Sequence, residues 1–492
     1  MNILGISGGF HDAAATVIND KGDILFAGHS ERYSGIKNDP NIHIDIIKEV
    51  SKWRIDHVAY YETPWKKQLR QLYSGQGIEW EKITTKQVLN HQLHGFFNKV
   101  PVSTHTHHLS HAAAGFQTSP FYSATVVVID AIGEWDTISI WGAQYNMGKA
   151  VYKKLWSQKY PHSIGLFYSA MTQQAGLKPM EDEYILMGMA AYGSTVPSAL
   201  MTTNLIEEPY NITFKENLHI GTSFDWRKHF DSQDIAASAQ KVCEDLIYNV
   251  MDKAQSFNWS QNLVYMGGVS LNCLANRNLG RYFDNVWIMP NPGDAGSSLG
   301  AAALAYGKQL QWKDAYLGYD IPGDYPVEGL MKELLDNKIV GVASGRAEFG
   351  PRALGNRSLL ADPRGLDIKD RVNEIKHRQK FRPFAPVILS EHADEFFHMS
   401  SGFDSSPYMQ SVACCKYPDT YPAIVHVDGT SRVQTVSADS SSGIRRLLET
   451  WYKVTGCPML LNTSLNIKGE PMVNDRADAD RFEKLYGVKV LS

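Results

Sequence analysis

The sequence predicts an α/β protein whose first part consists of two similar halves. Apolar, β-branched runs at 3–7 and 124–129 each end in a glycine-containing loop. Each run is followed by two further apolar segments that a turn joins, and the two units begin about 120 residues apart. Polar loops also follow later apolar runs, as in α/β proteins that bind ligands at the carboxyl ends of strands.

Three strands are expected in each half, because short apolar runs alternate there with turn signals. They lie at 3–7, 13–18 and 24–29 in the first half, and at 124–129, 137–142 and 151–156 in the second. This repeated unit has the layout of the actin-like ATPase and sugar-kinase superfold, in which a ligand sits between the halves.

The remaining elements follow the same pattern. Strands are expected at 263–266 and 286–289, each followed by a loop with glycine, and an Ala-rich helix is expected at 297–306. The stretch 316–326 is rich in Gly and Pro and predicts a linker. The sequence therefore predicts a domain at 1–318 and a second α/β domain at 319–492.

Composition excludes several classes of protein. Hydrophobic residues make up 43% and charged residues 20% of 492 residues, which is ordinary for a folded protein. The net charge of −4 excludes a strongly basic coat for nucleic acid. Five cysteines without a C-x-x-C pair exclude a disulfide framework and a zinc ribbon. No signal-like start and no run of 18 apolar residues occur, so a soluble, cytoplasmic protein is expected.

A histidine cluster gives the strongest chemical signal. His107 and His111 are four residues apart and share a face of the predicted Ala-rich helix, as a two-histidine metal clamp requires. Asp130 ends a buried strand and Asp294 lies in a Gly-rich loop, so both are candidate ligands. Imidazoles with carboxylates favour Fe²⁺, Mn²⁺ or Zn²⁺ over Ca²⁺. The alternative is a solvated His-rich loop in which Asp130 only accepts a hydrogen bond.

His11 and Asp12 follow the first glycine pair and are candidate catalytic residues. A histidine there could deprotonate a hydroxyl, since an imidazole pKa near 6.5 suits a general base at neutral pH. The alternative is a turn with an internally satisfied polar pair.

A basic stretch marks the second domain. Between residues 340 and 382 there are ten Lys or Arg and five Asp or Glu. Arginine suits bidentate contacts to phosphate, and glycines among the arginines allow close backbone approach. In a chain with net negative charge, a small polyanion such as ATP is a better partner than nucleic acid. A solvated basic face is the alternative. The loops 426–434 and 461–466 are polar and turn-rich like site loops.

Together these motifs resemble the O-carbamoyltransferases of the nodulation and antibiotic-tailoring type over nearly the whole chain. In the first domain the resemblance rests on the segments 8–14, 107–112, 130–135, 267–272 and 292–294. In the second it rests on 348–358, 381–386, 426–429 and 461–471.

The resemblance implies a two-step enzyme. A YrdC-like second domain would form carbamoyladenylate from ATP, bound with Mg²⁺, and carbamoyl phosphate. The actin-like first domain would move the carbamoyl group to a hydroxyl of a small acceptor such as a sugar, nucleoside or natural product. The family's Fe²⁺-like metal would bind His107, His111, Asp130 and Asp294. Residues expected to bind nucleotide or carbamoyl phosphate are Asn272, Arg346, Arg352, Arg357, Arg378, Lys380, Arg382, His426, Arg432, Asn462 and Asn466.

The chain departs from the family pattern at Ile185, where members usually carry a lysine. It is also shorter than typical members, which suggests a different acceptor. Two other functions stay open: threonylcarbamoyl transfer to tRNA, which a pI near 6.5 disfavours, and a degenerate nucleotide-binding regulator. No membrane partner is expected, and a homo-oligomer stays open.

Overall fold

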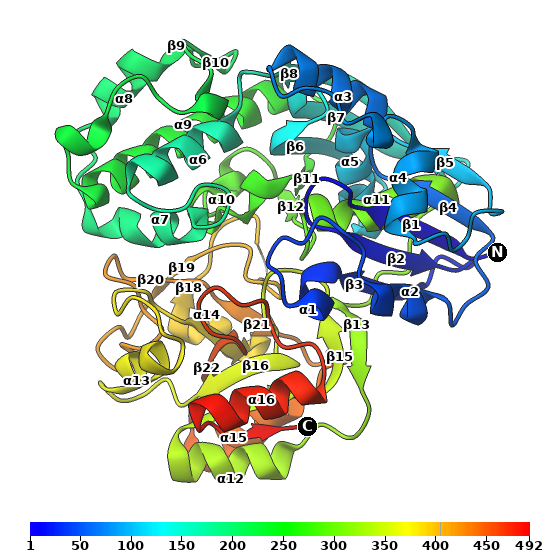
Figure 1. The fold of residues 1–492 in the computed structure, drawn as a ribbon. Coiled ribbons are helices and arrows are strands. Elements are labelled where there is room, and N and C mark those ends of the chain that lie inside the picture. Colours follow the sequence, from blue (N-terminus) through cyan, green and yellow to red (C-terminus); the bar gives the residue numbers. More distant parts are fainter. Residues whose placement is uncertain (404) are drawn as a thin grey trace. The chain divides into compact units, whose positions relative to one another are not determined.

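The computed structural model describes residues 1–403 and 405–492, which form two compact units (Figure 1). The first unit comprises residues 1–26 and 40–312, and the second comprises 27–39 and 313–492. The observed boundary at 312/313 lies six residues before the predicted one at 318/319, and the segment 27–39 joins the second unit, which the sequence does not predict. Part of the expected linker forms a strand, β13 (Tyr316–Ile321). The assignment of one activity to each domain stays a prediction.

The first unit contains two five-stranded sheets with the same topology. The first sheet has the order β3-β2-β1-β4-β5, and β1 runs antiparallel to β2 and parallel to β4. Its strands are β1 (Ile3–Ser7), β2 (Ala14–Ile18), β3 (Ile24–His29), β4 (His57–Tyr60) and β5 (Val102–Thr104). Residues 27–29 of β3 already belong to the segment 27–39 of the second unit.

The second sheet has the order β12-β11-β6-β7-β8, and β6 runs antiparallel to β7 and parallel to β11. The strand that begins each half therefore has the same neighbours in the same directions, which confirms the predicted duplication and the actin-like α/β fold. The strands are β6 (Ser123–Gly133), β7 (Asp136–Asn146), β8 (Lys149–Lys159), β11 (Asn262–Met266) and β12 (Asn285–Trp287).

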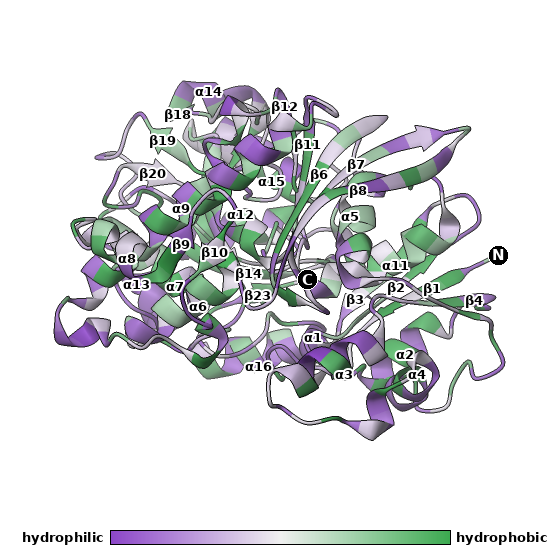
Figure 2. Ribbon diagram, turned by 90° about the horizontal axis from the view of Figure 1, so that it is seen from above, coloured by the Kyte–Doolittle hydropathy of each residue, from purple (hydrophilic) through white to green (hydrophobic). Residues whose placement is uncertain are grey.

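Two equivalent helices lie between the sheets. Helix α5 (His107–Thr118) follows the last strand of the first sheet and α11 (Ser297–Tyr306) follows the last strand of the second. They pack on each other, α11 covers β1 and β2, and α5 covers β6 and β11 (Figures 1 and 2). A Cβ on Gly300 would lie 1.8 Å from the backbone oxygen of Ser110, so only glycine permits this approach.

The other helices of the first unit pack around these layers, and the 25-residue α9 is the longest of those described. They are α2 (Ile44–Val50), α3 (Pro64–Tyr73), α4 (Thr85–Gln92), α6 (Ile164–Gln174), α7 (Glu183–Met189), α8 (Ser198–Leu205), α9 (Ser232–Ser256) and α10 (Cys273–Asn276). Ile185 is fully buried on α7, where a lysine would lose its hydration. Within the described residues, none of the helices combines the length and apolar character needed to cross a bilayer.

The second unit is an α/β domain around a mixed six-stranded sheet of order β21-β17-β22-β16-β14-β23. Its strands are β14 (Ile339–Ala343), β16 (Arg357–Ala361), β17 (Ala385–Leu389), β21 (Gln434–Val436), β22 (Met459–Ser464) and β23 (Val490–Leu491). Helix α15 (Ile444–Thr455) packs on β17 and β22 and buries Trp451 completely. The other helices of at least eight residues are α12 (Val327–Asn337), α13 (Ile368–Ile375) and α16 (Arg476–Tyr486).

The contact at Gly300 gives a first testable prediction. Gly300→Ala should destabilise the protein by about 1–3 kcal/mol, because the added methyl group overpacks the contact between α5 and α11. Gly188→Ala is the matched control: Gly188 is also helical, and a Cβ there meets nothing within 4 Å. That control should stabilise the protein slightly through helix propensity. Urea unfolding measures both, and equal midpoints for the two variants would contradict the packing argument.

Candidate functional site

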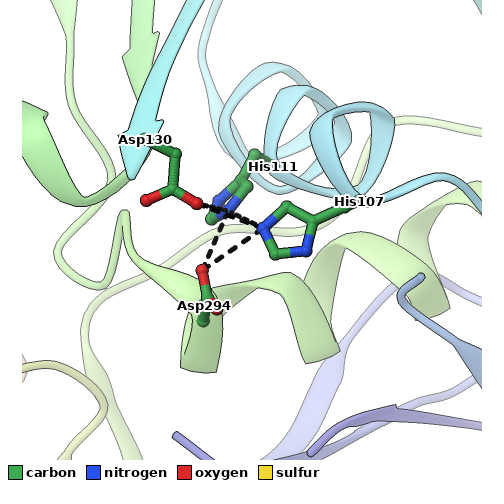
Figure 3. A group of neighbouring side chains, drawn as sticks. All are labelled: His107, His111, Asp130 and Asp294. Atoms are coloured by element: carbon green, nitrogen blue, oxygen red, sulfur yellow. Dashed lines mark hydrogen bonds and ion pairs between the residues drawn. The ribbon is translucent and has the colours of Figure 1, made fainter. Parts of the chain in front are cut away.

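Four side chains converge where the starts of α5 and α11 meet the end of β6 (Figure 3). His107 and His111 lie in the first turns of α5, Asp130 lies on β6, and Asp294 lies in the turn that precedes α11. One nitrogen or oxygen from each lies within 4.8 Å of those of the others. The structure thus brings together all four candidate metal ligands of the sequence analysis.

The histidines present the same ring nitrogen to both carboxylates. His107 Nε2 lies 3.2 Å from Asp130 Oδ2 and 3.3 Å from Asp294 Oδ1. His111 Nε2 lies 3.3 Å from Asp294 Oδ1, 3.8 Å from Asp130 Oδ2 and 3.1 Å from His107 Nε2.

These separations fit a shared transition metal. Ligand atoms about 2.1 Å from one ion lie about 3.0 Å apart at 90° and about 3.4 Å apart at the tetrahedral angle. Two imidazole nitrogens with two carboxylate oxygens are also the donor set that Fe²⁺, Mn²⁺ and Zn²⁺ accept. The residues present therefore fit the metal that the resemblance implies.

The pKa values of the histidines and carboxylates in the cluster are shifted in opposite directions. Burial acts to lower the pKa of His107, but Asp294 and Asp130 outweigh it and raise this pKa well above its usual value. Burial acts to raise the pKa of Asp130, yet the two histidines hold this pKa well below the usual range. The carboxylates are therefore ionised and require positive charge, which protons supply here and a cation could supply instead.

His11 and Asp12 lie side by side on the loop after β1, with 2.9 Å between His11 Nδ1 and Asp12 Oδ2. Burial acts to lower the pKa of His11, but the contact with Asp12 and the charges of Asp294 and Asp130 raise it to about 9. The structure differs here from the sequence argument, which assumed a pKa near 6.5. A pKa of about 9 favours the protonated form of His11, which donates a hydrogen bond in this arrangement.

Three predicted nucleotide-binding residues form structural contacts in the structure. The guanidinium of Arg357 is fully buried and donates to five backbone oxygens, those of Tyr319, Ser344, Gly345, Asn356 and Asn474. The amide of Asn462 donates to Ala353 O and Gln434 Oε1. Asn272 caps α10 and pairs with Gln240. Their side-chain donors serve the fold, whereas Asn462 Oδ1 is buried without a hydrogen-bond partner among the described residues. Direct ligand contacts by these three residues stay a prediction.

The other predicted residues of the second unit are more accessible. Arg346 is half-buried and donates to the backbone oxygens of Leu317 and Gly318. Lys380 is exposed near the carboxylates of Asp370 and Glu374. Those that are partly exposed are Arg352, Arg378, Arg382, His426, Arg432 and Asn466.

Lys376 is a buried residue that the sequence analysis did not single out. Its Nζ donates to Ser464 and Asn466, at 2.9 Å from Asn466 O and 3.0 Å from Asn466 Oδ1. Burial lowers the pKa of Lys376 well below its usual value, and Arg378 and Arg382 lower it further. Three cationic groups thus gather beside the end of β22, where the sequence predicts a loop, and this arrangement favours an anion. The basic stretch at 340–382 includes Lys376, but the sequence does not distinguish this lysine from the other basic residues beside it.

Two protein-family models and several known proteins match this chain. A protein-family model described as the carbamoyltransferase N-terminus matches residues 35–303, and one described as the carbamoyltransferase C-terminus matches residues 331–492. An uncharacterised protein of Synechocystis is 33% identical over 583 residues, which covers 98% of this chain and 94% of that protein.

Two nodulation proteins are also similar. Nodulation protein NolNO of Sinorhizobium fredii is 32% identical over 547 residues, covering 97% of this chain and 80% of its own length. Nodulation protein U of Bradyrhizobium diazoefficiens is 36% identical over 280 residues, covering 52% of this chain and 48% of its own.

Solved structures are more distant. Component A of the (R)-2-hydroxyglutaryl-CoA dehydratase of Acidaminococcus fermentans has 16% identity and a TM-score of 0.36, and covers 62% of this chain and 98% of that one. Full-length HypF in its phosphate- and nucleotide-bound form has 13% identity and a TM-score of 0.35. That match covers 62% of this chain and 55% of the HypF chain. The sequence identities and TM-scores of these two matches are too low to support a fold assignment. The fold assignment therefore rests on the duplicated sheets.

The four-ligand cluster predicts one transition metal per chain. Protein purified without chelator should contain close to one equivalent by elemental analysis. The variants His107→Ala and Asp294→Asn should lose most of it, because each removes a ligand. His229→Ala, at an exposed position, is the control and should keep the metal. Metal retained at wild-type level in His107→Ala would refute the site.

The cationic cluster predicts that Lys376 supports anion binding. Lys376→Met should weaken ATP binding about 10- to 100-fold, as expected when one charged hydrogen-bonding group is lost. Calorimetric titration of the full chain measures this, with Lys332→Met, an exposed position on α12, as the control. Equal ATP affinity in the Lys376→Met variant and the wild type would place the nucleotide elsewhere.

Proposed function

This chain belongs to the carbamoyltransferase family, and we propose that it is an ATP-dependent O-carbamoyltransferase that works through carbamoyladenylate. The observation that carries the proposal is a division of charge. A histidine–carboxylate cluster suited to a cation lies in the first unit, and a lysine–arginine cluster suited to an anion lies in the second.

In the proposed first step the second unit activates the carbamoyl group. Water first cleaves the bond that joins the carbamoyl group to phosphate, which gives carbamate and phosphate. A carbamate oxygen then bonds to the α-phosphorus of ATP, the bond between the α- and β-phosphates breaks, and carbamoyladenylate and pyrophosphate result. Both substrates are polyanions. Lys376, Arg378 and Arg382 are the groups that would hold them, since their mutual repulsion is relieved when an anion binds.

In the proposed second step the first unit transfers the carbamoyl group. The acceptor oxygen bonds to the carbamoyl carbon, the bond from that carbon to the adenylate oxygen breaks, and AMP leaves. A metal held by the four-residue cluster would supply Lewis-acid polarisation of the carbonyl. Fe²⁺ is our choice among the ions that suit these ligands.

The pair of His11 and Asp12 is proposed to handle the acceptor hydroxyl. A protonated His11 can donate a hydrogen bond to the departing phosphate, and the carboxylate of Asp12 can take the hydroxyl proton. The sequence suggests His11 as the base; we assign that role to Asp12 because the contact with Asp12 favours the protonated form of His11. The acceptor is proposed to be a small hydroxylated molecule, a class that includes sugars, nucleosides and natural products.

The two half-reactions should separate experimentally. Wild-type protein should release pyrophosphate from ATP only when carbamoyl phosphate is present, and labelled carbamoyl phosphate should label a product from host extract. His11→Ala should leave pyrophosphate release intact and slow transfer to acceptor about 10²–10³-fold, as for loss of a hydrogen-bond donor to developing negative charge.

His229→Ala again serves as the control and should behave as wild type in both assays. Absence of carbamoyl-phosphate-dependent pyrophosphate release in metal-loaded wild-type protein would refute the proposed function. Loss of that release in His11→Ala would refute the division of steps between the units.

A further inference from the structure

A buried carboxylate outside the four-residue cluster contacts the far nitrogen of a candidate metal ligand. Glu62 follows β4 and is fully buried, and its Oε2 lies 3.2 Å from His107 Nδ1. The opposite nitrogen of the same ring, Nε2, faces the cluster. A ring that donates from Nδ1 to a carboxylate has its Nε2 lone pair available for a metal. Glu62 thereby selects the tautomer that the cluster needs.

Lys67 compensates the charge of Glu62 inside the protein. Its Nζ lies 3.2 and 3.3 Å from the two carboxylate oxygens of Glu62, and the residue is only 8% exposed. The same Nζ lies 3.8 Å from the centre of the Phe10 ring, which is a cation–π distance. The ammonium is thus held between a carboxylate and an aromatic face.

Helix α3, which carries Lys67, has its polarity reversed relative to an ordinary surface helix. Its polar residues Lys67, Gln68 and Arg70 are buried. Four large apolar or aromatic side chains of the same helix are 47% to 70% exposed: Trp65, Leu69, Leu72 and Tyr73. Rotating α3 to bury these four would withdraw Lys67 from Glu62.

Stability does not explain this arrangement. A buried ion pair contributes little or nothing compared with apolar side chains of similar volume, and the exposed face of α3 forfeits hydrophobic burial as well. The polar inner face of α3 therefore indicates a role for the pair at the neighbouring site.

We propose that Glu62 and Lys67 are positioning residues of the metal centre, in which Glu62 fixes the tautomer and orientation of His107 and Lys67 compensates the charge of Glu62. This inference rests on the metal site of the proposed function. It concerns residues that would act through His107 and not on the substrate.

The test measures metal affinity on the full-length chain without using activity. Apo-protein is titrated with Co²⁺ in competition with a chromophoric chelator, and the visible spectrum of bound Co²⁺ is recorded. Glu62→Ala should weaken Co²⁺ binding about 10- to 100-fold and change the spectrum, as for other groups that orient metal ligands. Glu62→Gln should lose less Co²⁺ affinity, because the glutamine amide oxygen can still accept a hydrogen bond from His107 Nδ1.

A double-mutant comparison separates positioning from folding. Lys67→Met leaves the Glu62 charge buried and uncompensated, so it should weaken Co²⁺ binding more than the double variant Glu62→Gln/Lys67→Met. The matched control is Glu49→Gln/Lys52→Met, which removes an ion pair of the same residue types. Glu49 lies on α2 and Lys52 just after it, with 2.6 Å between Lys52 Nζ and Glu49 Oε2. It should leave Co²⁺ affinity unchanged.

Two outcomes would overturn the inference. One is Co²⁺ affinity and spectrum within about twofold of wild type in Glu62→Ala, or in the near-isosteric Glu62→Gln if the alanine variant does not fold. The other is a lower unfolding temperature in every variant without a change in Co²⁺ affinity, which would mean a purely structural role. If His107→Ala also keeps its metal, the proposed site itself has failed. If His107→Ala loses the metal while the Glu62 variants keep it, only this inference has failed.

Discussion

The close contact of α5 with α11 is the constraint on which the first unit depends. Gly300 lets the two helices approach until a side-chain carbon would no longer fit beside Ser110. Because the helices occupy equivalent places in the two halves, their N-terminal ends meet at the same point. His107 and Asp294 come from those two ends, and the partial positive charge of helix N-termini favours the carboxylates gathered there.

The net charge of −4 for the whole chain does not show that the two units gather charges of opposite sign at their clusters. In the first unit, carboxylates and imidazoles face one another, and their pKa shifts show a demand for positive charge. In the second unit, burial lowers the pKa of Lys376, and the charges of Arg378 and Arg382 lower it further. Each unit thus carries a cluster that favours a ligand of opposite charge.

The arginine-rich stretch shows where sequence reasoning reaches its limit. Arg357 and Arg378 have similar surroundings in sequence, with glycines or other cations nearby. In the structure Arg357 is fully buried and donates to five backbone oxygens, whereas Arg378 donates to Asn373 Oδ1 and Pro383 O and remains partly exposed over Phe384. Guanidinium donors serve a ligand or the fold depending on which carbonyls surround them, and residues far apart in the chain supply those carbonyls.

The sequence alone determined several elements of the first unit and the pair of candidate metal ligands within one helix. β1 and α11 have the bounds that their apolar patterns predict, because hydrophobic periodicity is local. The spacing of His107 and His111 likewise fixes a shared helix face. Only the tertiary structure could join Asp294 to these histidines, place Glu62 behind His107 and reverse the polarity of α3. Those contacts depend on how separate strands and helices pack, and local spacing does not encode that packing.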